Sequence, residues 1–361
     1  MLAASGVSVD GYVDVSYQHM DSAPLFSTST PAAPVYSRSF DNCQDCFSLH
    51  QLAVTVGYQP KEGFGALANL IAGDDPDVFA PYDINPGSRQ KFDFPNAYVQ
   101  YATGALTVIA GRYVSLAGAE TIDPRPDANS SRSILFYDAV PFTHTGVRAT
   151  WIANDHLTLI AGVVNGWDTL KDTNTDKTAE LGIAVAPAKG FTLAVNSYLG
   201  RERIGGLVAT GPQGMRKLFD VIGTWNVSDA LTLVVNYDLG RQQGTANTGY
   251  TPNNASTAGW DGLAAYVNYK FDDQWRVSLR GEYMNDSDGY RTGLVQKWNE
   301  VTLTVGYAPV KSTELRFELR NDWSNVDSAF VKDAGSYVTG LGYTDTTDRQ
   351  GSVAVEALFR F

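Results

Sequence analysis

Charged residues occupy every second position in several late segments of the chain. One segment carries Arg280 and Glu282, and a second carries Arg316, Glu318 and Arg320. Alternate residues of a β-strand point to the same face of a sheet, so each segment would place its charges on one side. Such rows can form cross-strand ion pairs that hold a wall together, or they can create a field that screens solutes in a pore. Both roles stay open for each arginine.

The same spacing, with charges at every second position, places charged residues on one face of strands along the whole chain. An Arg or Lys on the lipid face of a membrane barrel costs roughly 2–4 kcal/mol at the bilayer midplane. Confinement of the charges to one parity therefore indicates that the opposite face meets lipid, and we expect the charges to line water in a wide barrel. The residues predicted to form this lumen wall are Arg112, Arg148, Arg276, Arg280, Glu282, Arg316, Glu318, Arg320 and Arg360.

The chain shows no pattern typical of a catalytic or metal site. Its four histidines, His19, His50, His144 and His156, lie far apart in the sequence. We find no Gly-x-Ser-x-Gly, His-Glu-x-x-His or phosphate-binding motif. We therefore predict no catalytic residue, no metal and no cofactor, and we do not expect an enzyme. The net charge of -12 argues against a nucleic-acid partner.

The two cysteines, Cys43 and Cys46, are close neighbours in a polar segment. Two thiols alone make a poor zinc site, and no βαβ pattern supports a thioredoxin-like redox motif. In an oxidising compartment we expect a local disulfide between them.

Apolar residues alternate with polar or small residues throughout the chain. The clearest case is the last segment, in which Val353, Val355, Ala357, Phe359 and Phe361 occupy every second position. No apolar run reaches the roughly 18 residues that a membrane helix needs. The mean hydropathy is -0.18, which fits a membrane β-barrel because only alternate residues face lipid. The final segment, which stops on an aromatic residue, resembles the terminal strand of a bacterial outer-membrane barrel.

The connections between the alternating segments are short and long in turn. Seven short turns and eight long polar loops join sixteen strands, as in an antiparallel up-and-down transmembrane β-barrel. The third and eighth strands have the weakest patterns, so 14 or 18 strands stay open. A soluble β-propeller would instead repeat every 40–50 residues. We predict one domain, 1–361, with strands at 6–19, 47–59, 63–73, 92–102, 105–113, 144–153, 157–167, 178–187, 191–202, 215–227, 231–241, 260–271, 275–285, 297–308, 314–324 and 350–361.

Four short motifs resemble the putative β-barrel porin type 2 (OmpL-like) family. They are the stretches 11–17 (GYVDVSY), 111–114 (GRYV) with 117–120 (AGAE), 141–148 (PFTHTGVR) and 165–168 (NGWD). The similarity covers nearly the whole chain. It implies an integral protein of the bacterial outer membrane, and it transfers no catalytic residue.

The third long loop, 114–143, contains a segment that must be buried, Ile134 to Tyr137. The barrel interior is the nearest protected place, although a lid packed over the barrel mouth is an alternative. In general porins the third loop folds inward and narrows the pore. That resemblance implies that the pore constriction contains Glu120, Asp123, Arg125, Asp127 and Arg132.

We therefore expect a porin, a water-filled channel for passive diffusion of small hydrophilic solutes or ions. The alternative is a barrel that serves as a scaffold or sheath for a partner such as an electron-transfer cytochrome. Expected partners are outer-membrane lipid, lipopolysaccharide, the solutes themselves and further copies of the chain in a homotrimer. Residues 1–5 lack the features of a signal peptide, and we interpret the chain as a mature form.

Overall fold

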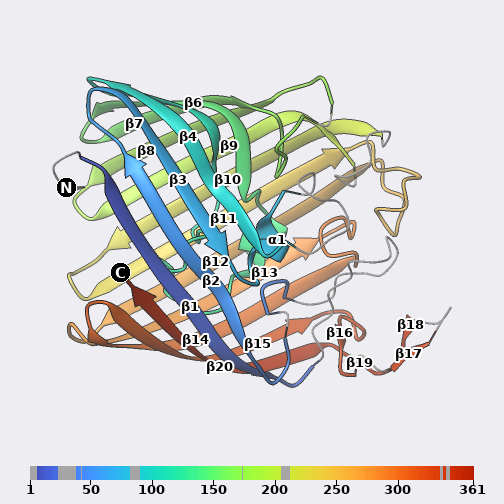
Figure 1. Ribbon diagram of the computed structural model, residues 1–361. Helices are drawn as coiled ribbons and strands as arrows, with labels where there is room; N and C mark the ends of the chain where they lie inside the picture. The colour runs from blue at the N-terminus through green and yellow to red at the C-terminus, as the bar shows by residue number, and fades with distance from the viewer. Residues whose placement is uncertain are drawn as a thin grey trace.

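The computed structural model describes residues 6–22, 38–41, 43–81, 90–172, 174–204, 212–333, 336–338 and 342–361. Sixteen strands form one closed antiparallel barrel in which neighbours in the chain are neighbours in the sheet (Figure 1). The barrel strands are β1 (Ser8–Met20), β2 (Cys46–Tyr58), β3 (Gly63–Ala72), β4 (Phe92–Thr103), β5 (Leu106–Val114), β6 (Thr143–Asn154), β7 (Leu157–Val164), β8 (Thr178–Ala188), β9 (Phe191–Arg203), β10 (Gln213–Asn226), β11 (Leu231–Gln243), β12 (Thr257–Lys270), β13 (Trp275–Asp286), β14 (Gln296–Val310), β15 (Thr313–Ser324) and β20 (Arg349–Arg360).

The predicted fold class is confirmed, including the third and eighth strands. The interpretation of residues 1–5 lies outside the described residues, as do parts of the loops predicted at 20–46, 74–91, 168–177, 203–214 and 325–349. The long-loop end of the barrel has two short helices within its loops, α1 (Pro76–Phe79) and α2 (Ile134–Asp138), and α2 packs inside the barrel. This end also carries two small hairpins, β16 (Phe330–Val331) with β19 (Thr346–Thr347) and β17 (Tyr337–Val338) with β18 (Gly342–Tyr343).

The opposite, short-turn end is where β1 begins and β20 ends (Figure 1). Between β4 and β5 the pair Thr103 and Leu106 closes a two-residue turn. Gly104 opens that turn with a φ of 55°, a left-handed conformation that glycine adopts without the cost of a Cβ clash. Neither helix in the described part of the chain is long and apolar enough to cross a membrane.

The barrel closes where β1 pairs with β20, from Tyr12 opposite Arg360 to Met20 opposite Ser352. The backbone N–H groups of Gly11 and Phe361 each donate to the other residue's carbonyl at 2.9 Å. A Cβ on Gly11 would lie 2.5 Å from the Phe361 ring. The glycine therefore allows the last aromatic side chain to lie flat on the first strand.

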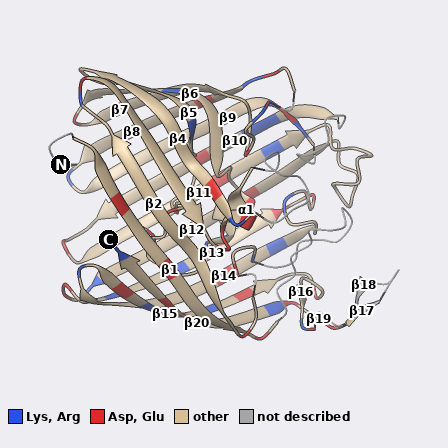
Figure 2. Ribbon diagram, in the orientation of Figure 1, with Lys and Arg blue, Asp and Glu red and all other residues tan. Residues whose placement is uncertain are grey.

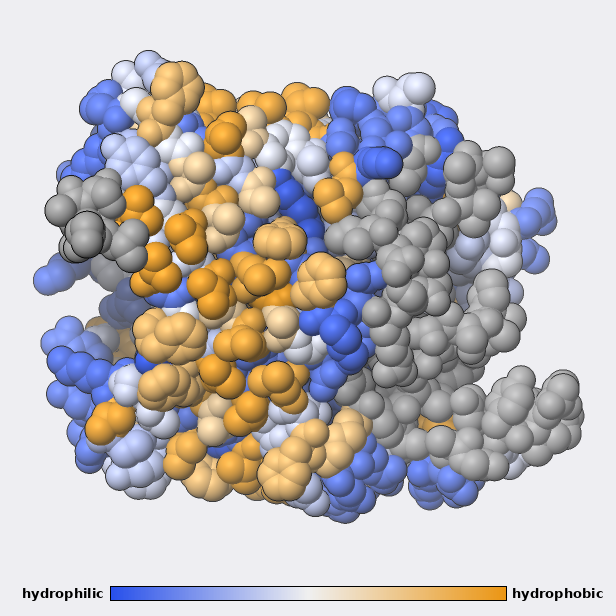
Figure 3. Space-filling model, viewed as in Figure 1, coloured by the Kyte–Doolittle hydropathy of each residue, from blue (hydrophilic) through white to orange (hydrophobic). Residues whose placement is uncertain are grey.

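The barrel exterior is an apolar belt. Large aliphatic and aromatic side chains such as Leu303, Phe317 and Val353 stand exposed on it. Figure 3 shows this belt on one face, with hydrophilic residues at both rims. An exposed apolar band of this kind is the surface that a barrel presents to lipid.

The apolar core lies inside the barrel, where loop residues pack on inward-facing strand residues. One cluster joins Leu135 of α2 to Trp260, Tyr266 and other inward side chains. A second joins Phe136 to Tyr12 and to residues of α1. These contacts bury the segment Ile134 to Tyr137, apart from the partly exposed Tyr137.

Candidate functional site

The third long loop, residues 114–143, runs inside the barrel along the inward side chains of β9 to β15. The backbone N–H of Gly118 donates to the Asp220 carboxylate at 3.2 Å. The next residue, Ala119, donates its N–H to Asn236 at 2.9 Å. The loop backbone is therefore hydrogen-bonded to one wall strand after another. These bonds satisfy loop N–H groups that have no partner in a β-sheet.

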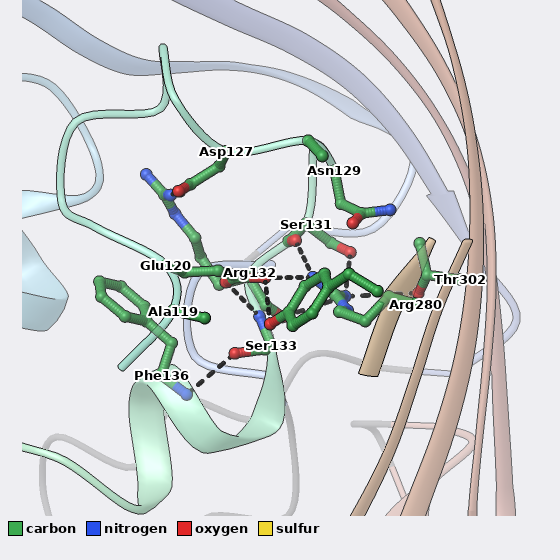
Figure 4. Close-up of polar contacts among 12 residues, drawn as sticks. Ala119, Glu120, Asp127, Asn129, Ser131, Arg132, Ser133, Phe136, Arg280 and Thr302 are labelled. Carbon is green, nitrogen blue, oxygen red and sulfur yellow. Dashed lines mark hydrogen bonds and ion pairs between the residues drawn. The ribbon is translucent and has the colours of Figure 1, made fainter. Parts of the chain in front are cut away.

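Arg280 on β13 is the central contact between wall and loop (Figure 4). Its guanidinium donates to Glu120 of the loop at 2.8 Å and to Glu300 of β14 at 2.9 Å. It also donates to the backbone carbonyl of Ser131 at 2.7 Å. The Arg280 side chain has no exposed surface, so these charge-assisted bonds form away from water, where an unpaired partner would be costly.

Wall carboxylates bind loop N–H groups on either side of this arginine. Glu282 accepts from the N–H groups of Ile134 and Leu135, at 3.1 and 3.2 Å, at the start of α2. Glu318 accepts from the N–H of Ser130 at 2.7 Å. Acids and bases of the wall therefore both serve to fix the loop.

Arginines near the short-turn end bind the loop through its carbonyl groups. Arg276 donates to the carbonyl of Ala128 at 2.6 Å, and Arg316 donates to that of Pro124 at 3.1 Å. Together with Arg280, these contacts hold the segment from 119 to 134 against strands β11 to β15.

Arg125 sits at the solvent-facing edge of the loop. Its guanidinium donates to Asp10 at 2.7 Å and to Asp123 at 2.6 Å, and it lies 4.7 Å from the centre of the Tyr12 ring. The side chains of Arg125, Asp10 and Asp123 are 27%, 46% and 35% exposed. This ion triplet joins loop and first strand where water reaches both.

The structure separates the five predicted constriction residues into two groups. Asp123 and Arg125 are partly exposed, whereas Glu120, Asp127 and Arg132 are buried. Arg132 forms an ion pair with Asp127 and donates to the loop carbonyl at 122 at 2.9 Å. The buried three therefore fix the loop's own shape or its attachment to the wall.

The predicted wall residues lie on the inner face, but most of them do not line water. The side chains of Arg280, Arg316 and Arg320 are almost completely buried, as is Glu318. Our expectation that these charges face water is wrong for this set, because strand parity gives the face of a residue but not what covers it. The loop packs over them.

Four of the predicted arginines lie outside this covered set or at its edge. Arg112 pairs with Asp93 at 2.7 Å, and Arg148 pairs with Glu180 at 2.6 Å, both within the wall. Arg276 and Arg360 have partly exposed side chains, 25% and 38%. These last two are therefore the wall arginines that water can reach.

A second part of the wall is uncharged and partly exposed, and sequence analysis did not single it out. Inward-facing Thr, Ile, Ala and Val fill the half of β5 to β11 nearest the short turns, and β7 is almost wholly free of charge in Figure 2. The described loop contacts this surface less fully than the charged wall. This uncharged wall consists of Thr107, Ile109, Thr150, Thr158, Ile160, Ala184, Thr192, Ala194, Ile222, Thr224, Thr232 and Val234.

Part of the first long loop also enters the barrel. Phe40 packs on Phe136 and Phe142 with ring centres 5.8 and 6.0 Å apart. Arg38 forms an ion pair with Asp41 at 3.0 Å and donates to Gln350 of β20 at 3.2 Å. This contact was not predicted, because Phe40 is one of several aromatic residues in the first long loop.

Ser16, His50 and Asp75 form a chain of hydrogen bonds with the order of a catalytic triad. Ser16 Oγ lies 2.8 Å from His50 Nε2, and His50 Nδ1 lies 2.9 Å from Asp75 Oδ1. A β-bulge places His50 here, because Asp14 pairs with Gln51 while Val15 pairs with Leu49.

The surroundings of this chain do not suit acyl transfer. The cavity beside Ser16 has a volume of about 20 Å³, which is room for roughly one water molecule. Among the residues that the structure describes, no three His, Cys, Asp or Glu side chains are grouped to hold a metal ion.

Cys43 is joined by a disulfide to Cys46, the first residue of β2. The bridge spans a sequence separation of three residues. It therefore constrains only the short segment that leads into the strand.

Two acidic side chains outside the strands have raised pKa values. Asp168 accepts the N–H groups of Phe142 and Thr143 at 2.8 and 2.9 Å where the third loop ends. Burial raises the pKa of Asp168 to about 6, although these donors lower it. Burial likewise raises the pKa of Asp138, at the end of α2, to about 8; Arg291 opposes this shift and Asp286 adds to it.

Comparison with known sequences gives one family match. The model of the family described as "Putative beta-barrel porin-2, OmpL-like" matches residues 6–361. A search of curated proteins found no match.

Several solved structures share this fold. OmpT of Vibrio cholerae, in its trimer form, has a TM-score of 0.62 at 13% identity, over 98% of this chain and 99% of that chain. The anion-selective porin from Comamonas acidovorans gives 0.62 at 12%, over 98% and 99%. The outer-membrane channel DcaP of Acinetobacter baumannii gives 0.61 at 13%, over 98% and 97%. At these identities the likeness concerns the fold.

Proposed function

Because the chain belongs to the OmpL-like family of putative beta-barrel porins, we propose that it is an outer-membrane porin through which small hydrophilic solutes and ions diffuse passively. The observation that carries the proposal is the closed sixteen-strand barrel with an apolar exterior and a partly exposed, uncharged inner wall. A barrel of about eight strands is filled by its own side chains, whereas sixteen strands enclose room for an aqueous passage.

The passage runs beside the uncharged wall, and the third loop narrows it from the opposite side. Within the loop, Asp123 and Arg125 supply the charges that meet the solute, together with Asp10 of β1. Their partial exposure supports this assignment. Glu120, Asp127 and Arg132 act indirectly, since their burial and hydrogen bonds suit them to hold the loop in position.

The alternative of a sheath around a partner protein requires a free lumen. The loop 114–143 and residues 38–41 occupy that space in the structure, which favours the porin. We also propose that the chain is not an enzyme, because the hydrogen-bonded chain at Ser16 faces a cavity the size of one water molecule.

The porin is proposed to sit in outer-membrane lipid and lipopolysaccharide and to assemble as a homotrimer. The apolar belt supports the contact with lipid, and the trimer form recorded for Vibrio cholerae OmpT supports the assembly by analogy. Native mass spectrometry in detergent tests the assembly, and a monomer at all protein concentrations would overturn it.

Conductance in a planar lipid bilayer tests the function. The purified barrel is expected to produce stable current steps in KCl, and liposomes that contain it are expected to swell in small sugars. Protein that resists SDS until heated, as folded barrels do, but produces no steps and no swelling would overturn the proposal.

A further inference from the structure

Three arginines converge on one carboxylate near the short-turn end of the barrel. Glu314 of β15 accepts from Arg276 at 2.6 Å, and it lies 3.3 Å from Arg316 and 3.3 Å from Arg360. A Cβ on Gly306 would come within 2.8 Å of both Arg276 and Glu314. The glycine therefore lets that ion pair lie flat on the wall, and the cluster has more guanidinium than carboxylate.

The three arginines differ in how completely their donors are used. Arg316 is buried, and it also pairs with Glu356 at 3.2 Å and with a loop carbonyl. Arg276 uses one further donor on the carbonyl of Ala128. Arg360, in contrast, has a 38% exposed side chain, and among the described residues its guanidinium donates to Glu314 at 3.3 Å.

The neighbouring ion triplet of Arg125, Asp10 and Asp123 is not suited to bind an anion. Arg125 directs its donors to Asp10 and Asp123, so this group has one more acid than base. Arg316 Nε also lacks a partner among the described residues, but Arg316 is buried. The guanidinium groups that a solute can reach at this end of the lumen therefore belong to Arg360 and Arg276.

At the short-turn end, the opposite side of the lumen is uncharged. In a closed ring of sixteen strands, β20 stands eight places from β8, so the two lie across the barrel from each other. The end of β20 carries Arg360, and the uncharged wall covers the same end of β5 to β11. A solute between them meets positive charge on one side and hydroxyl and aliphatic groups on the other.

We propose that Arg360 and Arg276 form an anion subsite for the carboxylate of a small organic acid whose uncharged body faces the uncharged wall. The inference rests on the proposed porin function and gives it a class of solute. A guanidinium suits this task because its fork of donors matches the two oxygens of a carboxylate.

Benzoate and its uncharged counterpart benzamide are the probes. Each is added to both compartments of a planar bilayer at low KCl, where charge interactions are least screened, and the fall in channel current is measured. Benzoate is expected to block the channel of the unaltered protein at a lower concentration than benzamide. Equal block by the two compounds would overturn the subsite.

Two variants and one control locate the effect. Arg360→Gln should raise the half-blocking concentration of benzoate on the order of tenfold, the loss of about one charge-assisted hydrogen bond. Glu314→Gln should lower it, because a competing carboxylate is removed. Arg349→Gln, which changes an arginine with a 72% exposed side chain at the far end of β20, should leave it unchanged.

The outcomes separate this inference from the function on which it rests. A folded unaltered barrel without current steps would overturn both. Current steps with no change in benzoate block in Arg360→Gln would overturn the subsite alone. If Arg360→Gln does not fold, Glu314→Gln decides, and an unchanged or weaker benzoate block in it would overturn the proposal.

Discussion

Replacing Arg280 with methionine should release the third loop from the barrel wall. The substitution keeps much of the side-chain volume and removes the charge that Glu120, Glu282 and Glu300 share. It also leaves the carbonyl of Ser131 without its donor. Breaking a buried charge pair by removing one partner costs about 3–5 kcal/mol. Since about 1.4 kcal/mol corresponds to a factor of ten, the fraction of protein with a displaced loop should rise roughly 10²- to 4 × 10³-fold.

Two measurements report the displacement. Single-channel recordings of Arg280→Met should show larger and noisier current steps, because a displaced loop no longer narrows the passage. Limited trypsin digestion should cut the loop after Arg132, which Ser133 follows, faster than in the unaltered protein. Arg349→Met is the matched control, since its arginine is exposed at the rim of β20.

The barrel itself should survive the change, because the strand pairing of β13 with β12 and β14 does not use the Arg280 side chain. Migration in SDS with and without heating checks this point. A folded Arg280→Met barrel with unchanged conductance and unchanged trypsin resistance would refute the reasoning that this arginine holds the loop.

Two further predictions concern stability. Asp138 has a pKa of about 8 in the folded protein, against about 3.9 for an ordinary aspartate. Between these two values the folded state holds a proton that the unfolded state has lost. The free energy of unfolding therefore falls as pH rises from about 4 to about 8, and then levels off. Asp138→Asn should raise the temperature of heat-induced unfolding in SDS at pH 8 more than at pH 5, and equal shifts at both would contradict the assignment. Gly11→Ala would place a Cβ 2.5 Å from the Phe361 ring and 2.6 Å from the Ala53 carbonyl, so it should destabilise the barrel by about 1–3 kcal/mol. Gly223→Ala, where nothing lies within 4 Å of the added Cβ, is its control. Equal unfolding temperatures for the two variants would contradict close packing at Gly11, where β1 pairs with β20.

Apolar alternation, together with the alternation of short turns and long loops, was enough to predict the barrel. Each strand needs only its own residues to show which face is apolar, and the last strand was predicted at 350–361 and observed at Arg349–Arg360. The pairing of β1 with β20 that closes the barrel follows as well, because the first and last strands are the two that still need a partner. The β-bulge at His50 was not predictable in this way, because it inserts one residue without disturbing the apolar pattern around it.

The site depends on contacts that are distant in sequence. Parity placed Arg280 and Arg316 on the inner face, but their burial follows from a loop about 150 to 190 residues earlier, as in the bonds from Arg280 to Ser131 and from Arg316 to Pro124. The uncharged wall was overlooked for a related reason. Thr150 and Thr224 are uncharged, so the pattern of charges did not point to them. They become candidates to line the passage only because the loop covers the charged wall.

Chemical accessibility of single cysteines tests most directly the claim that the passage runs beside the uncharged wall. Both native cysteines are first changed to serine. Thr224→Cys then places a thiol on the uncharged wall, and Thr304→Cys places one on the buried wall, where the native threonine is bonded to Asn129. A charged methanethiosulfonate reagent should reduce the current through the Thr224→Cys channel and leave that of Thr304→Cys unchanged. Block at Thr304→Cys with none at Thr224→Cys would contradict the account.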